Sequence, residues 1–218
     1  MSDTPAFTQE KDADGVLVLT LDVPGEKLNT LGKGLIAEFE LLLSEVARDE
    51  SVRAVVLRSG KPDSFIAGAD IKDFTRIGSA EEGEALSRAG HAIFDRLEGC
   101  RVPVVAAIHG TCLGGGTELA LACRYRVASD DPKTSIGLPE VMLGFVPGAG
   151  VTQRLPRLVG LATSLDLILT GRALKAPRAR KAGLVDEVCP APILLAVAKK
   201  AALGLADGSL RPSRPGIG

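Results

Sequence analysis

The chain has 218 residues, of which 45% are apolar and 24% charged, the composition of an ordinary folded protein with room for a substantial core. Its formal net charge is −1, so no overall positive field favours nucleic acid or an anionic membrane as a partner. Aromatic residues make up only 3% and Trp is absent, which argues against a platform for stacking bases.

The N-terminal residues and the cysteines bear on the compartment. Residues 1–15 are polar and acidic and lack the pattern of a signal peptide, and no apolar run approaches the ~20 residues of a membrane span. The four cysteines form no Cys-x-x-Cys pair and lie among aliphatic or small residues, as buried thiols do in a reducing compartment. His91 and His109 have no zinc-ligand spacing with them. We therefore expect a cytoplasmic protein without a metal site.

Apolar runs typical of strands alternate with helical patterns along the chain. The strand candidates are residues 15–23, 53–59, 104–110, 125–129 and 185–189. Residues 31–48 and 81–97 repeat apolar positions at spacings of three and four, as an amphipathic helix does. Further helix candidates are residues 150–159, 161–169, 178–182 and 191–206. The alternation predicts an α/β fold with buried sheets.

The domain organisation follows from where the apolar patterns end. We expect residues 1–190 to form one core and residues 191–206 to form a C-terminal helix. Residues 207–218 contain Pro, Gly and polar residues with little to pack, which is typical of a linker or a truncated tail.

Three glycines at 114–116 run directly into an apolar helical segment. Within it, Glu118 is the only acidic or basic residue between positions 109 and 124. Glycine lets a ligand approach the backbone, and the first N–H groups of a helix lack internal acceptors and attract anions. The pattern is typical of a site for an oxyanion with a carboxylate nearby. A tight turn followed by an acidic first helical turn would have the same sequence, because the helix dipole favours acids there.

Glu140 is a second solitary acid, with no other charge between Lys133 and Arg154. It follows Pro139, a residue suited to the first position of a helix. By itself it is equally well explained as a first-turn glutamate. If Glu118 and Glu140 converge in an apolar setting, burial and mutual repulsion favour one protonated and one ionised form, which is an acid/base pair.

The stretch 64–72 follows a predicted strand and contains small residues that can expose a backbone N–H, for instance that of Ala67 beside Gly68. The alternative is a surface turn before a helix, with Asp70 as its cap. Neither a Gly-x-Ser-x-Gly elbow nor a Gly-x-Gly-x-x-Gly turn occurs after a strand, so a serine hydrolase and a dinucleotide fold are poorly supported.

Taken together, these stretches resemble the crotonase (enoyl-CoA hydratase/isomerase) superfamily over about residues 15–189. The similar segments are DVPGEKLNTL (22–31), GKPDSFIAGADI (60–71), HGTCLGGGTELALAC (109–123), and DDPKT (130–134) leading to LPEV (138–141). Within the family the chain is most similar to the branch in which this region forms the N-terminal part of a multifunctional fatty-acid oxidation α-subunit. The resemblance implies a spiral of repeated β-β-α units with C-terminal helical elements, here truncated.

The resemblance also implies roles for particular residues. Glu118 and Glu140 would be the catalytic carboxylates, and the backbone N–H groups of Ala67 and Gly115 would form an oxyanion hole. The substrate and its CoA would lie along Lys27, Asn29, Ala67, Gly68, Ala69, Asp70, Gly114 and Gly115. The implied reaction is reversible addition of water across the 2,3 double bond of a trans-2-enoyl-CoA in fatty-acid β-oxidation. No cofactor is expected, because coenzyme A is part of the substrate.

Two other functions are compatible with the same residues. One is an enoyl-CoA isomerase that moves a double bond with a single carboxylate, and the other is a non-catalytic acyl-CoA-binding fragment. The presence of both glutamates favours the hydratase, with Glu140 as proton donor and Glu118 as the residue that activates water. We expect a homo-oligomer or, in a longer protein, linkage to a 3-hydroxyacyl-CoA dehydrogenase domain and association with a thiolase subunit. Val151 departs from the family, in which another Gly is common at this position.

Overall fold

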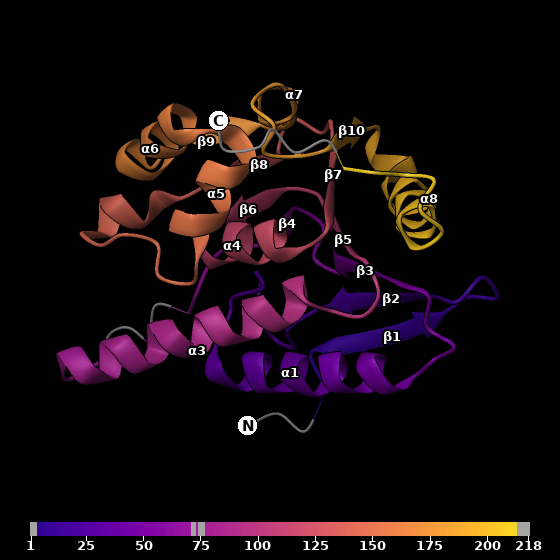
Figure 1. The fold of residues 1–218 in the computed structure, drawn as a ribbon. Coiled ribbons are helices and arrows are strands. Elements are labelled where there is room, and N and C mark those ends of the chain that lie inside the picture. Colours follow the sequence, from indigo (N-terminus) through magenta and orange to yellow (C-terminus); the bar gives the residue numbers. More distant parts are fainter. Residues whose placement is uncertain (1–3, 71–72, 74–76, 213–218) are drawn as a thin grey trace.

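The computed structural model describes residues 4–70, 73 and 77–212 (Figure 1). The larger of its two sheets contains β1 (Phe7–Lys11), β2 (Val16–Leu21), β3 (Ala54–Ser59), β5 (Val104–Ile108), β7 (Tyr125–Ser129) and β10 (Glu187–Cys189). These strands lie side by side in this order, and all neighbouring pairs are parallel except the antiparallel pair of β1 and β2. The sheet and its helices confirm the predicted α/β class.

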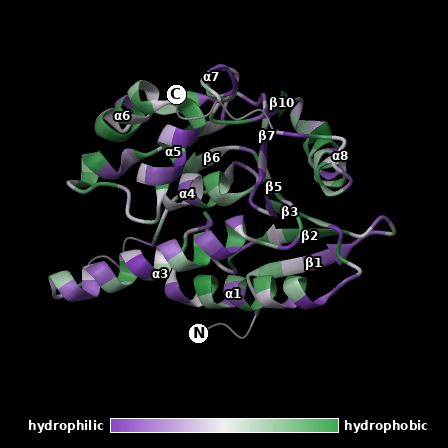
Figure 2. Ribbon diagram, viewed as in Figure 1, coloured by the Kyte–Doolittle hydropathy of each residue, from purple (hydrophilic) through white to green (hydrophobic). Residues whose placement is uncertain are grey.

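Helices cover both faces of the larger sheet. α1 (Lys33–Arg48) and α3 (Ala80–Glu98) share a hydrophobic core with one face, and α8 (Leu194–Ala206) shares a separate core with the other. Every residue of β5 and β7 is therefore buried, as is usual for strands in the middle of a parallel sheet. In Figure 2 hydrophobic and hydrophilic residues alternate along α1 and α3, as expected of helices with one buried and one exposed face.

The chain winds as a spiral, because β3, β5 and β7 of the larger sheet each lead into a short strand of a second sheet. β3 leads to β4 (Ser64–Ile66), β5 leads to β6 (Thr111–Leu113), and β7 leads to β8 (Ser135–Gly137). A helix follows each short strand: α3 after β4, α4 (Gly115–Ala122) after β6, and the 3-10 helix η1 (Pro139–Leu143) after β8. This repeated unit confirms the spiral that the family resemblance implies.

The second sheet gathers segments that are far apart in the sequence. β4, β6 and β8 are adjacent and parallel, so their carboxyl ends meet at one edge. A bridge between Leu31 and Ala69 adds the segment before α1 to the same edge. Residues 67–70, 114–116 and 138–140 all leave the sheet there, and ligands of α/β folds commonly bind at the carboxyl ends of parallel strands.

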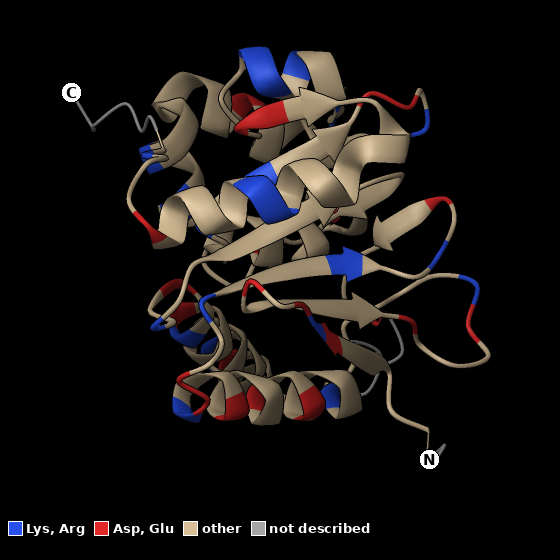
Figure 3. Cartoon of the chain, turned by 90° about the vertical axis from the view of Figure 1, so that its right-hand side faces the viewer, with Lys and Arg blue, Asp and Glu red and all other residues tan. Residues whose placement is uncertain are grey.

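The C-terminal part packs around this edge and then returns to the larger sheet. After η1 come α5 (Val151–Val159), α6 (Leu161–Thr170), β9 (Ala173–Lys175), α7 (Ala176–Lys181), and, beyond β10, the 3-10 helix η2 (Ala191–Ile193). Acidic and basic residues are interspersed over the elements seen in Figure 3, consistent with the small net charge. None of the described helices is long and apolar enough to cross a membrane.

The short strands were not predicted. β4, β6, β8 and β9 have three residues each, too few for a hydrophobic period to show. β1 has five residues, but only Phe7 is buried, so its sequence is as polar as that of a loop. The longer elements did follow their patterns, and the buried residues of α1 lie on the predicted face.

Candidate active site

The three glycines lie where β6 turns into α4. Gly114 precedes the helix with φ 53° and ψ −126°, a conformation that only glycine adopts readily. Its N–H donates to the carbonyl of Gly137 at 2.9 Å, and the Thr117 hydroxyl donates to that same carbonyl and to the carbonyl of Cys112. Because Gly115 begins α4, its N–H has no acceptor within the helix and lies at the positive end of the helix dipole.

Glu118 lies in the first turn of α4, and only 4% of its surface is exposed. Its Oε1 accepts the N–H groups of Ala149 at 2.7 Å and of Val151 at 3.2 Å. The pKa of the Glu118 carboxyl is raised on balance, because the effect of burial exceeds that of these two donors and of the nearby His91 and Arg154 side chains, which lower it. The side chain is thus buried, but held by groups that favour its ionised form.

Glu140 follows Pro139 in η1 and is 7% exposed. Its Oε2 is buried without a hydrogen-bond partner in the described part of the chain. Burial, and to a smaller degree the negative charge of Glu118, raise the pKa of Glu140 to about 7, against the effect of its own backbone N–H. Both its protonated and its ionised form are therefore populated near neutral pH.

The structure brings Glu118 and Glu140 together around Gly114. The N–H of Glu118 donates to the carbonyl of Gly114 at 3.0 Å. The Oε1 of Glu140 lies 3.0 Å from the position that a Cβ would take at Gly114. Glycine is thus required here both for its backbone conformation and because a side chain would crowd the carboxylate. The negative charge of Glu118 also raises the pKa of Glu140, so the two predicted carboxyls lie near each other beside the start of α4.

The prediction that the N–H of Ala67 is free to bind an oxyanion is wrong. Its N–H donates to the carbonyl of Asn29 at 2.9 Å and is therefore already used inside the fold. Gly68, with φ 124°, breaks the alternation of peptide directions that follows β4. As a result, the next N–H donated to the neighbouring segment is that of Asp70, which reaches the carbonyl of Leu31 at 3.1 Å.

Ala69 is the residue of this loop whose amide lies beside Gly115. Ala67 and Asp70, on either side of it, donate their N–H groups to the segment of residues 29–31. The N–H of Ala69 points away from that segment. The nitrogen of Ala69 lies 3.5 Å from the position that a Cβ would take at Gly115. The predicted residues Gly68 and Gly114 are also neighbours, since the Cα of Gly68 lies 3.7 Å from the position of a Cβ at Gly114.

The side chain of Asn29 is not available to bind substrate. It is fully buried, and its amide joins three strands and the loop after β2. Its Nδ2 donates to Leu21 O, Ser59 Oγ and Phe65 O, and its Oδ1 accepts the N–H of Val23. The expectation for Asn29 is corrected to a structural role. Lys27 is exposed, and the backbone bond between Asn29 and Ala67 keeps this segment beside residues 67–70.

The turn that holds Glu118 was not predicted as part of the site. Ala149 and Val151 contribute only backbone N–H groups, which leave no signature in the sequence. Val151, which departs from the family, is fully buried and still presents its N–H to Glu118. Among the described residues, no group of three or more His, Cys, Asp or Glu side chains is placed to hold a metal ion.

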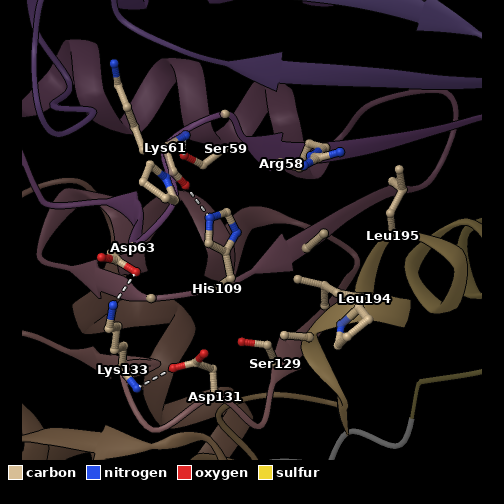
Figure 4. A pocket seen from close by; sticks show the side chains of 16 residues that line it. Arg58, Ser59, Lys61, Asp63, His109, Ser129, Asp131, Lys133, Leu194 and Leu195 are labelled. Carbon is tan, nitrogen blue, oxygen red and sulfur yellow. Dashed lines mark hydrogen bonds and ion pairs between the residues drawn. The ribbon is translucent and has the colours of Figure 1, made fainter.

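A separate cavity of about 460 Å³ lies at the carboxyl ends of β3, β5 and β7 and the start of α8 (Figure 4). Arg58, Lys61, His109 and Leu194 are among the residues that line it, and neither glutamate is. His109 Nε2 donates to the carbonyl of Lys61 at 2.5 Å, which agrees with a structural role for this histidine. The cavity is distinct from the region between the two carboxylates.

Comparisons with known proteins agree with the fold. Residues 11–213 match the family model described as enoyl-CoA hydratase/isomerase. The fatty acid oxidation complex subunit alpha of Idiomarina loihiensis is 54% identical over 217 residues, which are 100% of this chain and 31% of that protein. The protein of the same name from Shewanella sp. (strain MR-4) is 54% identical over 197 residues, or 90% of this chain and 28% of that one. The chain thus spans about a third of the length of these relatives.

Solved structures are similar over nearly the whole chain. The enoyl-CoA hydratase from Bacillus anthracis has a TM-score of 0.82 and 33% identity, covering 93% of this chain and 76% of that one. The enoyl-CoA hydratase from Mycobacterium smegmatis has a TM-score of 0.84 and 28% identity, covering 93% and 77%. With the family match across residues 11–213, the chain belongs to the enoyl-CoA hydratase/isomerase family.

Proposed function

We propose that the chain is an enoyl-CoA hydratase, which adds water reversibly across the 2,3 double bond of a trans-2-enoyl-CoA. The observation that carries this proposal is the proximity of two buried glutamates beside Gly114 and the helix-start amide of Gly115, which has no acceptor within α4. Hydration of a conjugated thioester needs an acid, a base and a site for the developing oxyanion. These groups lie within one small region of the structure.

The thioester oxygen would accept the N–H groups of Gly115 and Ala69. As water adds at C3, negative charge develops on this oxygen, and the two fixed donors and the dipole of α4 stabilise it. Loss of one comparable donor costs roughly 3–4 kcal/mol in other enzymes. Ala69 replaces Ala67 in this role because its N–H is not donated to the segment of residues 29–31.

Glu118 would take a proton from the attacking water, and Glu140 would supply a proton to C2. Both N–H donors to Glu118 go to Oε1, which leaves Oε2 for the water and favours the ionised form that a base needs. The pKa of Glu140, about 7, keeps a protonated population at neutral pH. One O–H bond of water breaks as the C3–O bond forms, and the enolate then takes the proton of Glu140. Proton exchange with solvent resets both carboxyls.

An apolar surface next to Glu140 supports a substrate with a hydrocarbon chain. Met142, Leu143 and Val146 follow Glu140 and are 69%, 60% and 62% exposed. α6 packs on η1, and Gly171 directly after α6 lies against Val141 and Met142. An exposed apolar surface beside a reactive centre is typical of a site that binds an apolar ligand. We place the acyl chain along it.

We further propose that the chain acts in fatty acid oxidation, as part of a larger assembly in the cytoplasm. Its relatives bear the name fatty acid oxidation complex subunit alpha, which supports the pathway and the assembly. The four cysteines are free and three of them are buried, a state that suits a reducing compartment.

The test is hydration of crotonyl-CoA by the Glu118→Gln and Glu140→Gln variants. Each substitution keeps the size of the side chain and removes its acid/base function, so each should lower kcat by about 10²- to 10⁴-fold. Glu45→Gln, at an exposed position of α1, is the matched control and should keep the parent rate. Circular dichroism checks that the variants are folded. Full hydration rate in both site variants would end the assignment.

The same variants separate the other two functions. An enoyl-CoA isomerase with a single carboxylate would convert 3-enoyl-CoA and keep that activity in one of the two glutamate variants. A binding module would bind CoA thioesters without turnover in the parent chain. Activity restored only in a longer chain would instead show that a further segment completes the site.

A further inference from the structure

The turn of residues 148–150 before α5 holds Glu118. It joins the helix at Gly150, whose carbonyl accepts the N–H groups of Gln153 and Arg154. The N–H groups that reach Glu118 come from Ala149 and Val151, on either side of Gly150. Gly150 has φ 106°, in the left-handed region, so the peptide groups around it are set by their surroundings. Whatever fixes this turn also fixes the position of the Glu118 carboxylate.

The Arg154 side chain holds the turn at Ala149. Its Nη1 donates to the carbonyl of Ala149 at 3.2 Å. Its Nε donates to Glu98 at 2.8 Å and its Nη2 to Asp95, both on α3. The side chain is only 10% exposed. A Cβ at Gly150 would lie 2.2 Å from Nη1, so the guanidinium occupies the space that the glycine leaves free.

α3 contacts the other end of the same turn as well. The Ser87 hydroxyl donates to the carbonyl of Gly148 at 2.5 Å. The position of a Cβ at Gly90 lies 3.0 Å from the Cβ of Ala149, so α3 approaches the turn closely at a glycine. The turn therefore lies against α3 at Gly90 and is tied to it through Ser87 and through Arg154.

We propose that Arg154 is a positioning residue for the reaction, clamping the Ala149 peptide to α3 so that Glu118 keeps the orientation that activates water. The proposal rests on the proposed function of Glu118 as a base. The guanidinium fork spans two carboxylates and a carbonyl, a set of contacts that the single ammonium of lysine cannot reproduce. The positive charge of Arg154 also favours the ionised form of Glu118.

Arg154→Met tests the proposal, with Arg157→Met as the matched control on the same helix. Arg157 is exposed, and within the described residues its side chain donates to Gln153 of its own helix, so its variant should behave as the parent. Arg154→Met should lower kcat for crotonyl-CoA by about 10²-fold, the effect of a small misplacement of a catalytic group. KM should change by less than about threefold, since the lost contact does not touch substrate.

The pH profile separates positioning from general damage. The groups that face Glu118 are His91 on α3, Arg154 on α5 and Glu140 on η1, and the anchors Asp95 and Glu98 lie behind Arg154. Loss of the Arg154 cation disfavours ionised Glu118, so the acid limb of kcat/KM should move to higher pH in Arg154→Met. Arg154→Lys keeps the charge and should lose rate without that upward movement.

Amide exchange in two variants tests the clamp independently of catalytic activity. Amide exchange of Ala149 and Val151 should accelerate about tenfold or more in Arg154→Met, and in the double variant Asp95→Asn with Glu98→Gln, because the clamp is released. If Arg154→Met does not fold, Arg154→Lys and the double variant provide the test.

The outcomes also separate the two proposals. An unchanged hydration rate in Glu118→Gln overturns the proposed function. A Glu118→Gln variant without activity, beside Arg154 variants with parent kcat, pH profile and amide exchange, overturns the clamp alone.

Discussion

The pKa of the Glu140 carboxyl is raised by the groups that surround it. The carboxyl lies in an apolar segment, one of its oxygens has no hydrogen-bond partner among the described residues, and Glu118 lies close by. Each of these conditions disfavours the charged form, and together they raise its pKa from 4.5 to about 7. An isolated acid in this setting is costly for the fold when ionised, which makes it suited to donate a proton.

Glu140→Gln should therefore stabilise the protein at high pH. The folded pKa lies above the unfolded one, so the contribution of Glu140 to stability is complete below pH 4.5 and is lost as pH rises through about 7. Gln resembles the protonated form at every pH. The free energy of unfolding of the variant, minus that of the parent, should grow by about 1–2 kcal/mol between about pH 5 and about pH 8, allowing for partial solvent screening.

Urea unfolding at the two pH values measures this difference. Glu45→Gln on the exposed side of α1 is the control, and its difference from the parent should stay constant. A constant difference for Glu140→Gln as well would show that the carboxyl is not perturbed in the fold.

The start of α4 shows how an element can be built around a missing side chain. Gly114 has backbone angles that glycine adopts readily, and it lies against Glu140. Its N–H donates to the carbonyl of Gly137 in β8. Thr117 ties the first turn to the same β8 carbonyl. The helix thus begins at a fixed place relative to β8, and these two contacts set the direction of the Gly115 amide.

Gly114→Ala should disrupt both the backbone and the site. The methyl group would meet Glu140 Oε1 at 3.0 Å in a conformation that costs a non-glycine residue about 1–3 kcal/mol. We expect that loss of stability together with a fall in hydration rate of about 10²-fold or more. Thermal unfolding and crotonyl-CoA kinetics measure the two effects.

Gly34→Ala is the matched control for this substitution. A Cβ at Gly34 in the first turn of α1 meets nothing within 4 Å. Alanine there should leave activity unchanged and stabilise the protein by up to about 1 kcal/mol. Normal activity in Gly114→Ala would contradict the placement of Glu140 against this glycine.

Across the whole molecule, the C-terminal part is tied to the larger sheet by a buried ion pair. Arg126 in β7 is 1% exposed and pairs with Asp186, which directly precedes β10. Asp186 also accepts the N–H of Arg126 at 2.8 Å, and Arg126 Nη1 donates to the carbonyl of Cys123. The chain leaves the larger sheet after β7, builds the surroundings of the carboxylates, and returns at this pair.

Asp186→Ala should strongly destabilise the protein, because it leaves the Arg126 charge buried without this partner. Loss of one member of a buried pair costs about 3–5 kcal/mol. Glu84→Ala removes the partner of Arg88 in an exposed pair on α3, and should cost no more than about 0.5 kcal/mol. Denaturant unfolding compares the two. Equal, small effects would show that the Asp186 pair does not hold the return to β10.

The longer elements and the residue types of the site could be predicted from the sequence alone. The helices α1 and α3 and the strands β2, β3, β5 and β7 followed from hydrophobic periods, since burial of one face demands a regular spacing. Glu118 and Glu140 stood out because each is the only charge in an apolar segment, and the glycines at 114–116 because they run directly into a helical pattern. Their chemical types pointed to a carboxylate pair beside free amides.

Long-range contacts required the three-dimensional structure. Whether Ala67 or Ala69 turns its N–H toward Gly115 depends on strand register and on the φ of Gly68, which a run of small residues does not reveal. The side chain of Asn29 joins β2, β3 and β4. From its residue type alone, the same amide could equally well bind a ligand. Arg154 meets Glu98 and Asp95 across 56 and 59 positions of sequence, and only the folding of the chain makes them partners. Residue type determines which chemistry is available, whereas the direction of each donor is a property of the folded chain.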